Sequence, residues 1–486
     1  MNSRSMKKSK TSITILLLIA LLVLAAVVKR EREAKVKSKI VAHFPFTFGT
    51  SVDPTNIFTV GQQVIAEHTF AFLARRSINR GFDGSAASVQ IDSTNNFFRA
   101  QLMTSVKSAD GKTFDKKDLC STLKTTVLGT THAPYKSLLK EIVCDDTGVS
   151  VFYKTLPTNI RYLLTLPDFC LYRANEIPLN GANMKSATGP YYPEMISNER
   201  VVLKRNKHFP KELVANDIEE AELVAYSASE ASLLIEKLDF ETDSAAYFFG
   251  YSINDSDIER LKNKNFEIEI SPQEWLMYFK VSDTVPQNVK SALNSLTEKI
   301  RAVVSEATLG EPTETLAQYG NAQLSSSLPS DLKALEGVTL FTMSNWSSTP
   351  AFRKILDVVR DLAPGFKIVT LPREKMSDLY SNKVPIGLNV LGLSPVDKLS
   401  HLSFLATSLE GFSSIISVDE IAAASAITDE VQLNEKLRQF DHRLQASKLI
   451  LPVAHFPGVI AVSKQWKVNR DLAFDWGIQL WSIQSR

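Results

Sequence analysis

Strand-like and helix-like patterns alternate along the chain from about residue 39. The clearest unit spans residues 338–373, where an apolar strand, a polar loop and a helix starting at Pro350 precede a second strand, FKIVTL. Apolar positions recur along that helix at the helical period, at Ile355, Val358, Val359 and Leu362. A strand, a helix and a strand in this order predict a βαβ crossover and therefore a parallel sheet.

Two further strand pairs are predicted outside this unit. Residues 141–156 read EIVCDDTGVSVFYKTL, which predicts two strands joined by a turn at Asp145–Gly148. A second pair follows Gly189, where a strand from Tyr191 and a strand at Val201–Lys204 flank a polar reversal. The chain is therefore expected to mix helices and strands, with at least one doubly wound part.

The first 39 residues have a different pattern from the rest. Four basic residues precede an uninterrupted apolar run at Ile13–Val28, and further basic residues follow it directly. A basic segment before an apolar segment is typical of an export signal. We expect an uncleaved signal anchor through residues 11–28 in the inner membrane; a signal peptide cleaved after Ala25 is the alternative. Both interpretations place the folded part in the periplasm or cell envelope.

Charge separates this N-terminal segment from the remainder. Residues 1–39 hold ten Lys and Arg and two Glu, which leaves 45 basic and 51 acidic residues and a net charge of −6 for the rest. A nucleic-acid partner requires the opposite field and is not expected. At 486 residues, the chain is long enough for two or three packed units.

The sequence contains few residues in patterns that indicate a catalytic or metal-binding site. Cys120, Cys144 and Cys170 permit at most one internal disulfide and match no zinc-binding spacing. They are expected to be buried structural cysteines, and whether two of them are bonded is left open. No nucleophile–base pair, phosphate-binding glycine loop or paired carboxylate motif is present, so we expect neither an enzyme nor a cofactor. The tripeptide His-Phe-Pro occurs three times, at His43, His208 and His455, in three different sequence contexts.

Five segments in order carry a resemblance to a known family. They read TSVDPTNIF, SADGKTFDKKDLCSTLK, SATGPYYPEMISNERVVLKRN, ALNSLTEKIRAVVSEA and EKLRQFDHRLQASKLILPVAHFPGVIAVS, beginning at residues 50, 108, 186, 292 and 435. From about residue 40 to its end, the chain resembles the extracellular solute-binding protein family 5, the peptide-binding receptors of ABC importers.

The resemblance implies a two-lobed clam-shell of the periplasmic-binding-protein type (class II), with mixed and parallel sheets and a hinged ligand cleft. Residues 40–273 and 451–486 would form lobe I, with an inserted subdomain at about 60–180, and residues 274–450 would form lobe II. Strands near Ile270–Val281 and Leu449–His455 would cross between the lobes. Trp275 and Met277 would share one face of the first crossing strand, with Tyr278 on the other.

The resemblance also implies positions that contact ligand. They are the helix start at Gly61 and Gln62, Trp275 on the crossing strand, the loop at Asn345 and Trp346, and the segment with Leu393 and Asp397, together with His455. Peptide-binding members use an aspartate to hold the ammonium group of the peptide. In the corresponding stretch of this chain, GLSPVDKLSHLSFL, Leu393 replaces a tryptophan and Asp397 is the one acid left.

The implied function is capture of a peptide or similar small solute by a monomer that serves an inner-membrane ABC permease. Two alternatives stay open. One is a membrane-anchored sensory or interaction protein that uses the same fold without transport. The other is binding of a metal or metal chelate such as nickel or haem, for which His43, His455 and His401 are the candidate ligands. Structural histidines are the expected outcome, so no metal site is predicted.

Overall fold

The computed structural model describes residues 39–485 with gaps at 58, 78–80, 104–105, 130–131, 215–217, 239–244, 251–252, 308–310, 314–315, 317–331, 348, 394–396 and 471–478. The predicted signal or anchor at residues 11–28 lies outside this part. Within it, every helix is too short or too polar to cross a membrane.

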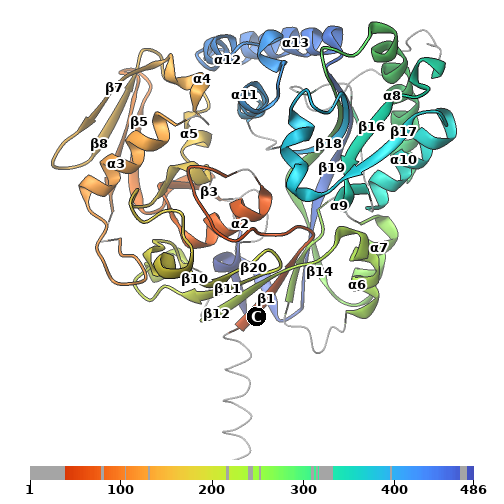
Figure 1. Cartoon of the computed structure of the whole chain (residues 1–486). Coiled ribbons are helices and arrows are strands. Elements are labelled where there is room, and N and C mark those ends of the chain that lie inside the picture. Colours follow the sequence, from red (N-terminus) through yellow and green to blue (C-terminus); the bar gives the residue numbers. More distant parts are fainter. Residues whose placement is uncertain are drawn as a thin grey trace, which may run out of the picture.

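A long mixed sheet runs through the molecule and joins its two sides (Figure 1). Its neighbouring strands, in spatial order, are β10 (Tyr191–Ile196), β11 (Arg200–Arg205), β12 (Glu220–Ala225), β1 (Lys39–Phe44), β13 (Ala245–Phe248), β19 (Ile450–Val462), β14 (Glu267–Val281), β18 (Ile386–Leu393), β16 (Thr339–Met343) and β17 (Lys367–Leu371). We call the side of the molecule that contains β10 to β13, with the elements packed beside them, the first half. The side that contains β18 to β17, with the helices packed on it, is the second half.

The two longest strands of this order form its centre. β14 and β19 pair antiparallel from Glu267 opposite Val462 to Lys280 opposite Ile450, so that each runs from one half to the other. The predicted crossing strands are thus present. Trp275, Met277 and Phe279 join the main core, whereas Leu276 and Tyr278 join a separate core on the opposite face of β14, as the alternation predicted. The lobe boundaries at 273 and 450, which fall at these strands, stay a prediction.

A smaller sheet and short helices lie beside the first half, at the upper left in Figure 1. The sheet has the order β5-β6-β8-β7, and the predicted turn at Asp145–Gly148 joins its last two strands. The elements of this region are β5 (Ala87–Asp92), β6 (Phe97–Leu102), α3 (Lys116–Val127), α4 (Ala133–Lys136), β7 (Leu139–Cys144), β8 (Val149–Tyr153) and α5 (Ile160–Leu163).

The second half contains the predicted βαβ unit. β16 and β17 pair in parallel and are joined by α10 (Pro350–Leu362), whose first turn is capped by the Thr349 side chain. The buried face of α10 differs from the predicted one. Leu362 is exposed, and the core side is formed by Ala351, Phe352, Ile355, Leu356 and Val359. The buried face therefore includes the first helical turn, where Phe352 is completely buried and its ring lies 5.9 Å from that of Trp346.

Three helices pack over β14 at the top of Figure 1. They are α11 (Lys398–Ser408), α12 (Val418–Ser425) and α13 (Glu430–Ser447), and their leucines and isoleucines surround Leu276 and Tyr278. The predicted helix at Ala292–Ala307 is the larger part of α8 (Gln287–Ala307). Its buried residues, among them Leu293, Leu296 and Ile300, belong to the main core.

The three cysteines divide into one disulfide and one thiol. Cys120 on α3 is bonded to Cys144 at the end of β7, while Cys170 is free and completely buried. Cys170 is buried as expected, whereas Cys120 and Cys144 are not fully buried and form the one internal disulfide that the cysteine count permits. A disulfide is the form expected of cysteines in an oxidising compartment.

Removing this disulfide should lower stability. The variant Cys120→Ser/Cys144→Ser releases a loop of 24 residues in the unfolded chain, which costs about 3–4 kcal/mol by loop entropy. Urea unfolding followed by circular dichroism measures the loss. As a control, a reductant should lower the stability of the unmodified chain and leave the double variant unchanged. Equal stability of variant and unmodified chain would contradict the prediction.

Candidate ligand-binding site

A cavity of about 520 Å³ lies between the two halves of the molecule. Its volume is in the range of roughly 300–1,000 Å³ that is usual for small-molecule sites. The first half contributes the segment after β1, the start of α2 (Val60–Thr69) and the stretch 163–168. The second half contributes Met343, Trp346, the end of β18 and one side of α11. Neither half alone encloses this space.

The start of α2 is fixed by local chemistry. Thr59 caps the helix, and the Thr59 N–H donates a hydrogen bond to the side-chain oxygen of Gln62 at 3.3 Å. Gly61 lies so close to the chain after β1 that a Cβ atom there would be 2.1 Å from the Thr47 carbonyl oxygen. Gly61 lines the cavity, and the neighbouring lining side chain is Gln63 rather than the predicted Gln62. The Gln63 amide donates to Glu67 at 2.9 Å.

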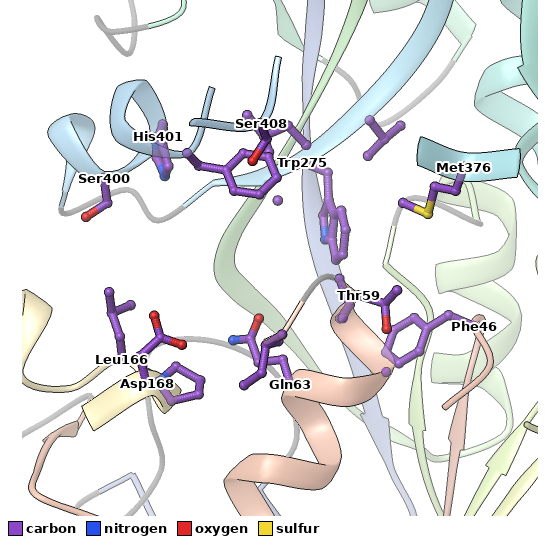
Figure 2. A pocket seen from close by; sticks show the side chains of 18 of the residues that line it. Phe46, Thr59, Gln63, Leu166, Asp168, Trp275, Met376, Ser400, His401 and Ser408 are labelled. Atoms are coloured by element: carbon purple, nitrogen blue, oxygen red, sulfur yellow. The ribbon is translucent and has the colours of Figure 1, made fainter. Parts of the chain in front are cut away.

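Both predicted tryptophans line the cavity. Trp275 on β14 is 6% exposed, and its ring centroid is 6.5 Å from that of Phe248. Trp346, in the short helix α9 (Ser344–Ser347), packs against Phe352 at 5.9 Å. Figure 2 shows Trp275 between the upper and lower walls of the space. The side chains of the predicted residues Asn345 and Leu393 lie outside the described part.

Asp397 is buried away from the cavity lining and serves as the N-cap of α11. Its carboxylate accepts hydrogen bonds from the Leu399 and Ser400 N–H groups at 3.0 and 3.3 Å, and from the Ser400 hydroxyl. The Asn159 amide donates a further bond at 2.9 Å. Burial raises the pKa of this carboxyl, and the hydrogen bonds act in the opposite direction. Asp397 is therefore occupied by protein donors rather than facing a ligand.

The Asn159–Asp397 bond connects the two sides of the cavity. The Asn159 amide also donates to the Tyr135 hydroxyl at 2.9 Å, and that hydroxyl lies 3.4 Å from Ser403 on α11. Nearby, the Thr158 N–H donates to the Ser425 carbonyl at 2.7 Å. We call these contacts the clasp: Tyr135, Thr158 and Asn159 on one side, and Asp397, Ser403 and Ser425 on the other. It holds the smaller sheet region against α11 and α12.

The candidate metal histidines do not converge. His43 stacks on Tyr247 at 4.7 Å, and the sheet register places Tyr247 opposite Ala461, six residues along β19 from His455. Six residues of strand span about 20 Å. His401 lines the cavity and is close enough to His455 to interact electrostatically. Burial lowers the pKa of His401 to about 3 and that of His455 to about 4, so both rings are neutral at physiological pH. His455 is not a lining residue.

Among the residues that the structure describes, no group of three His, Cys, Asp or Glu side chains could hold a metal ion. His68, which the sequence did not single out, has a structural role. His68 is completely buried, with Nδ1 2.6 Å from the Val64 carbonyl oxygen and Nε2 accepting from the Leu480 N–H at 3.1 Å. Burial lowers the pKa of His68 to about 4, consistent with a neutral ring that accepts this bond.

Asp168 is a cavity residue that the sequence did not reveal. It belongs to the 3₁₀ turn Pro167–Phe169, and its backbone carbonyl accepts from the Thr126 hydroxyl at 2.7 Å. Figure 2 shows its carboxylate directed into the open space, on the wall that also carries Gln63 and opposite Ser400 and His401. The signal was present as the single charged residue in the apolar stretch 163–171, LLTLPDFCL.

No family model and no curated protein matches this sequence. Solved structures do match it over most of its length. The murein tripeptide binding protein MppA of Escherichia coli is 12% identical with a TM-score of 0.73, covering 92% of this chain and 98% of that one. A periplasmic oligopeptide-binding protein of Borrelia burgdorferi is 13% identical with a TM-score of 0.73, covering 92% and 100%. NikZ of Campylobacter jejuni, in complex with Ni(L-His), is 16% identical with a TM-score of 0.69, covering 93% and 100%.

These likenesses confirm the predicted two-lobed α/β fold over more than nine-tenths of the chain. The matched structures are binding proteins rather than enzymes by their descriptions, in agreement with the expectation from the sequence. At this low sequence identity the likenesses establish the fold and do not identify the ligand.

Proposed function

Because the chain has the fold of the family 5 solute-binding proteins, we propose that it is an extracytoplasmic substrate-binding protein of an ABC importer. The observation that carries the proposal is the cavity whose walls come from both halves of the molecule. Its volume fits a peptide of a few residues or a solute of similar size. The matched protein NikZ was solved with a nickel–histidine complex, but the described residues here offer no group of three His, Cys, Asp or Glu side chains that could hold a metal ion.

Capture would occur by closure of the two halves around the solute. The clasp joins the halves on one side of the cavity, while β14 and β19 join them through the sheet. A solute that contacts both walls favours the closed arrangement over an open one, because only the closed arrangement provides all its contacts. Such a ligand-dependent closure is the property that a permease partner in the membrane would recognise.

Placement outside the cytoplasm is part of the proposal. The basic and apolar N-terminal segment is typical of export, and the Cys120–Cys144 disulfide is the form favoured in an oxidising compartment. The matched protein of Borrelia burgdorferi is described as periplasmic. The N-terminal segment would either be removed or hold the protein at the inner membrane beside its permease.

A thermal-shift screen tests the function. The full chain, purified in mild detergent because of its apolar segment, is heated with peptide pools, sugars, organic acids and nickel–histidine complexes. A bound solute at 100 times its dissociation constant should stabilise the protein by about 2.7 kcal/mol and raise the melting temperature. Tryptophan fluorescence provides a second readout because Trp275 and Trp346 line the cavity. Absence of stabilisation by every solute class would contradict the proposal.

A further inference from the structure

The described residues around the cavity carry a negative charge but no lysine or arginine. Among the described residues that line it, Asp168 is the only carboxylate, and none is a lysine or arginine. Two histidines also line it: His401, which is kept neutral by the low pKa that burial imposes, and His132, whose Nε2 faces Asp168 itself at 3.5 Å. A ligand carboxylate that entered this space would lose its water without meeting a lysine or arginine among the described lining residues. A ligand ammonium group, by contrast, would find one oppositely charged partner.

Asp168 is held in a position suited to that partner role. The Thr126 hydroxyl fixes its backbone carbonyl, and its side chain is 15% exposed, toward the cavity. The nearest ring nitrogen, Nε2 of His132, is 3.5 Å from Oδ2, which is long for a hydrogen bond. An ionised carboxylate has about four acceptor positions, so this contact leaves room for the N–H groups of a ligand.

The remaining walls suit an apolar body rather than a second charge. Aromatic side chains approach from both halves, namely Phe46 and Phe248 from the first half, Tyr380, Trp346 and Phe404 from the second, and Trp275 from the crossing strand β14. Aromatic faces bind aliphatic and aromatic groups and also attract cations. The hydroxyl and amide groups of Thr59, Gln63 and Ser408 add neutral polar positions around the same space (Figure 2).

From these observations we propose that the site selects a solute with an ammonium group and an apolar body but no free carboxylate. Asp168 is the specificity-determining residue, which pairs with the ammonium group of the ligand. This proposal rests on the proposed binding function and narrows its ligand class. It places the charge recognition on the wall formed by residues 163–168, not at Asp397, whose carboxylate is occupied by the clasp and the α11 N-terminus.

Four matched dipeptide libraries test it on the full chain, each containing apolar residues only. The first has a free amine and a C-terminal amide, the second is the free zwitterion, the third is acetylated and amidated, and the fourth is acetylated with a free carboxylate. Thermal shift and isothermal titration calorimetry rank the affinities of the four libraries, which differ only in the charges of their termini. We expect the cationic amides to bind best, about tenfold or more tighter than the neutral library, since a hydrogen bond between charged groups contributes that much.

The variant Asp168→Asn keeps the shape of the side chain and removes its charge. It should lose the preference for the cationic amides over the neutral library while still binding the neutral library, which also shows that the cavity is intact. Asp146→Asn is the matched control, because Asp146 lies in the same region with its side chain 96% exposed. That control should keep the unmodified preference.

The outcomes separate this proposal from the function on which it rests. Tightest binding of zwitterions or of anionic peptides, or an unchanged preference in Asp168→Asn, would overturn the ligand class and leave a peptide-binding function standing. Binding of sugars, organic acids or nickel–histidine with no binding of any library would likewise overturn the ligand class alone. Absence of binding by every solute tested contradicts both.

Discussion

Replacing Trp275 with alanine should lower the free energy of unfolding by about 3 kcal/mol and abolish measurable solute binding. Trp275 is 6% exposed at the centre of the molecule, where β14 pairs with Gly392 of β18 on one side and Phe456 of β19 on the other. Truncation removes the apolar surface that packs against Phe248. Because the ring also borders an existing cavity, the loss should lie at the low end of the 3–5 kcal/mol range for buried aromatic residues.

Binding should suffer for a separate reason. The indole forms part of the cavity wall, so its removal enlarges the space and takes away a rigid contact surface. Trp275→Phe is the matched control: it keeps an aromatic ring and should retain most of the stability and part of the affinity. Unfolding is best followed by circular dichroism in urea, since the substitution removes one of five tryptophans. A stability loss below about 1 kcal/mol in Trp275→Ala would contradict the role of this ring in the core.

The architecture could be predicted because its signals are local. The βαβ unit around α10 has a capping threonine, a proline in the first helical turn and a Pro-Gly stop, all of which act within a few residues. The alternation around Trp275 and Tyr278 likewise assigned the correct faces to β14. These features depend on backbone geometry, which neighbouring residues largely determine.

The cavity lining was harder to predict because it depends on how elements pack. Gln63 rather than Gln62 faces the cavity, a difference of one residue that turns a side chain by about 100° around a helix. Asp168 reaches the cavity because Thr126, far away in the sequence, holds the turn that carries it. Pairing across such distances leaves no periodic pattern in a single sequence.

At Asp397 the sequence did contain a local signal, that of a helix N-cap, but we interpreted the residue as a ligand contact. The sequence Asp-Lys-Leu-Ser has the composition of a helix N-terminus, and the structure uses Asp397 as the cap of α11. The resemblance suggested a ligand contact at this position. In the structure, the Asp397 carboxylate instead accepts hydrogen bonds from four donors of the protein itself, one of which is the Asn159 amide on the other side of the clasp.

The clasp leads to the second large effect, which concerns affinity more than stability. Replacing Asn159 with alanine should weaken solute binding by about tenfold to a hundredfold. With the clasp formed, as in this structure, Asp397 is 3% exposed, so the loss of the Asn159 amide leaves a buried carboxylate with one donor fewer. In an open arrangement water can replace that donor. The cost therefore falls on the closed arrangement, and the fraction of molecules competent to hold ligand decreases.

Kinetics distinguish this effect from damage to the cavity wall. A weaker clasp should raise the dissociation rate and leave the association rate nearly unchanged, because solute enters the open arrangement before the clasp forms. Stopped-flow tryptophan fluorescence, with the solute that gives the largest thermal shift, measures both rates. The matched control is Asn254→Ala, which removes the N-cap of α7 (Asp255–Asn263) and should cost about 1 kcal/mol of stability with unchanged affinity. Wild-type affinity and dissociation rate in Asn159→Ala would show that the clasp does not hold the halves together, and closure would then depend on the solute and the crossing strands alone.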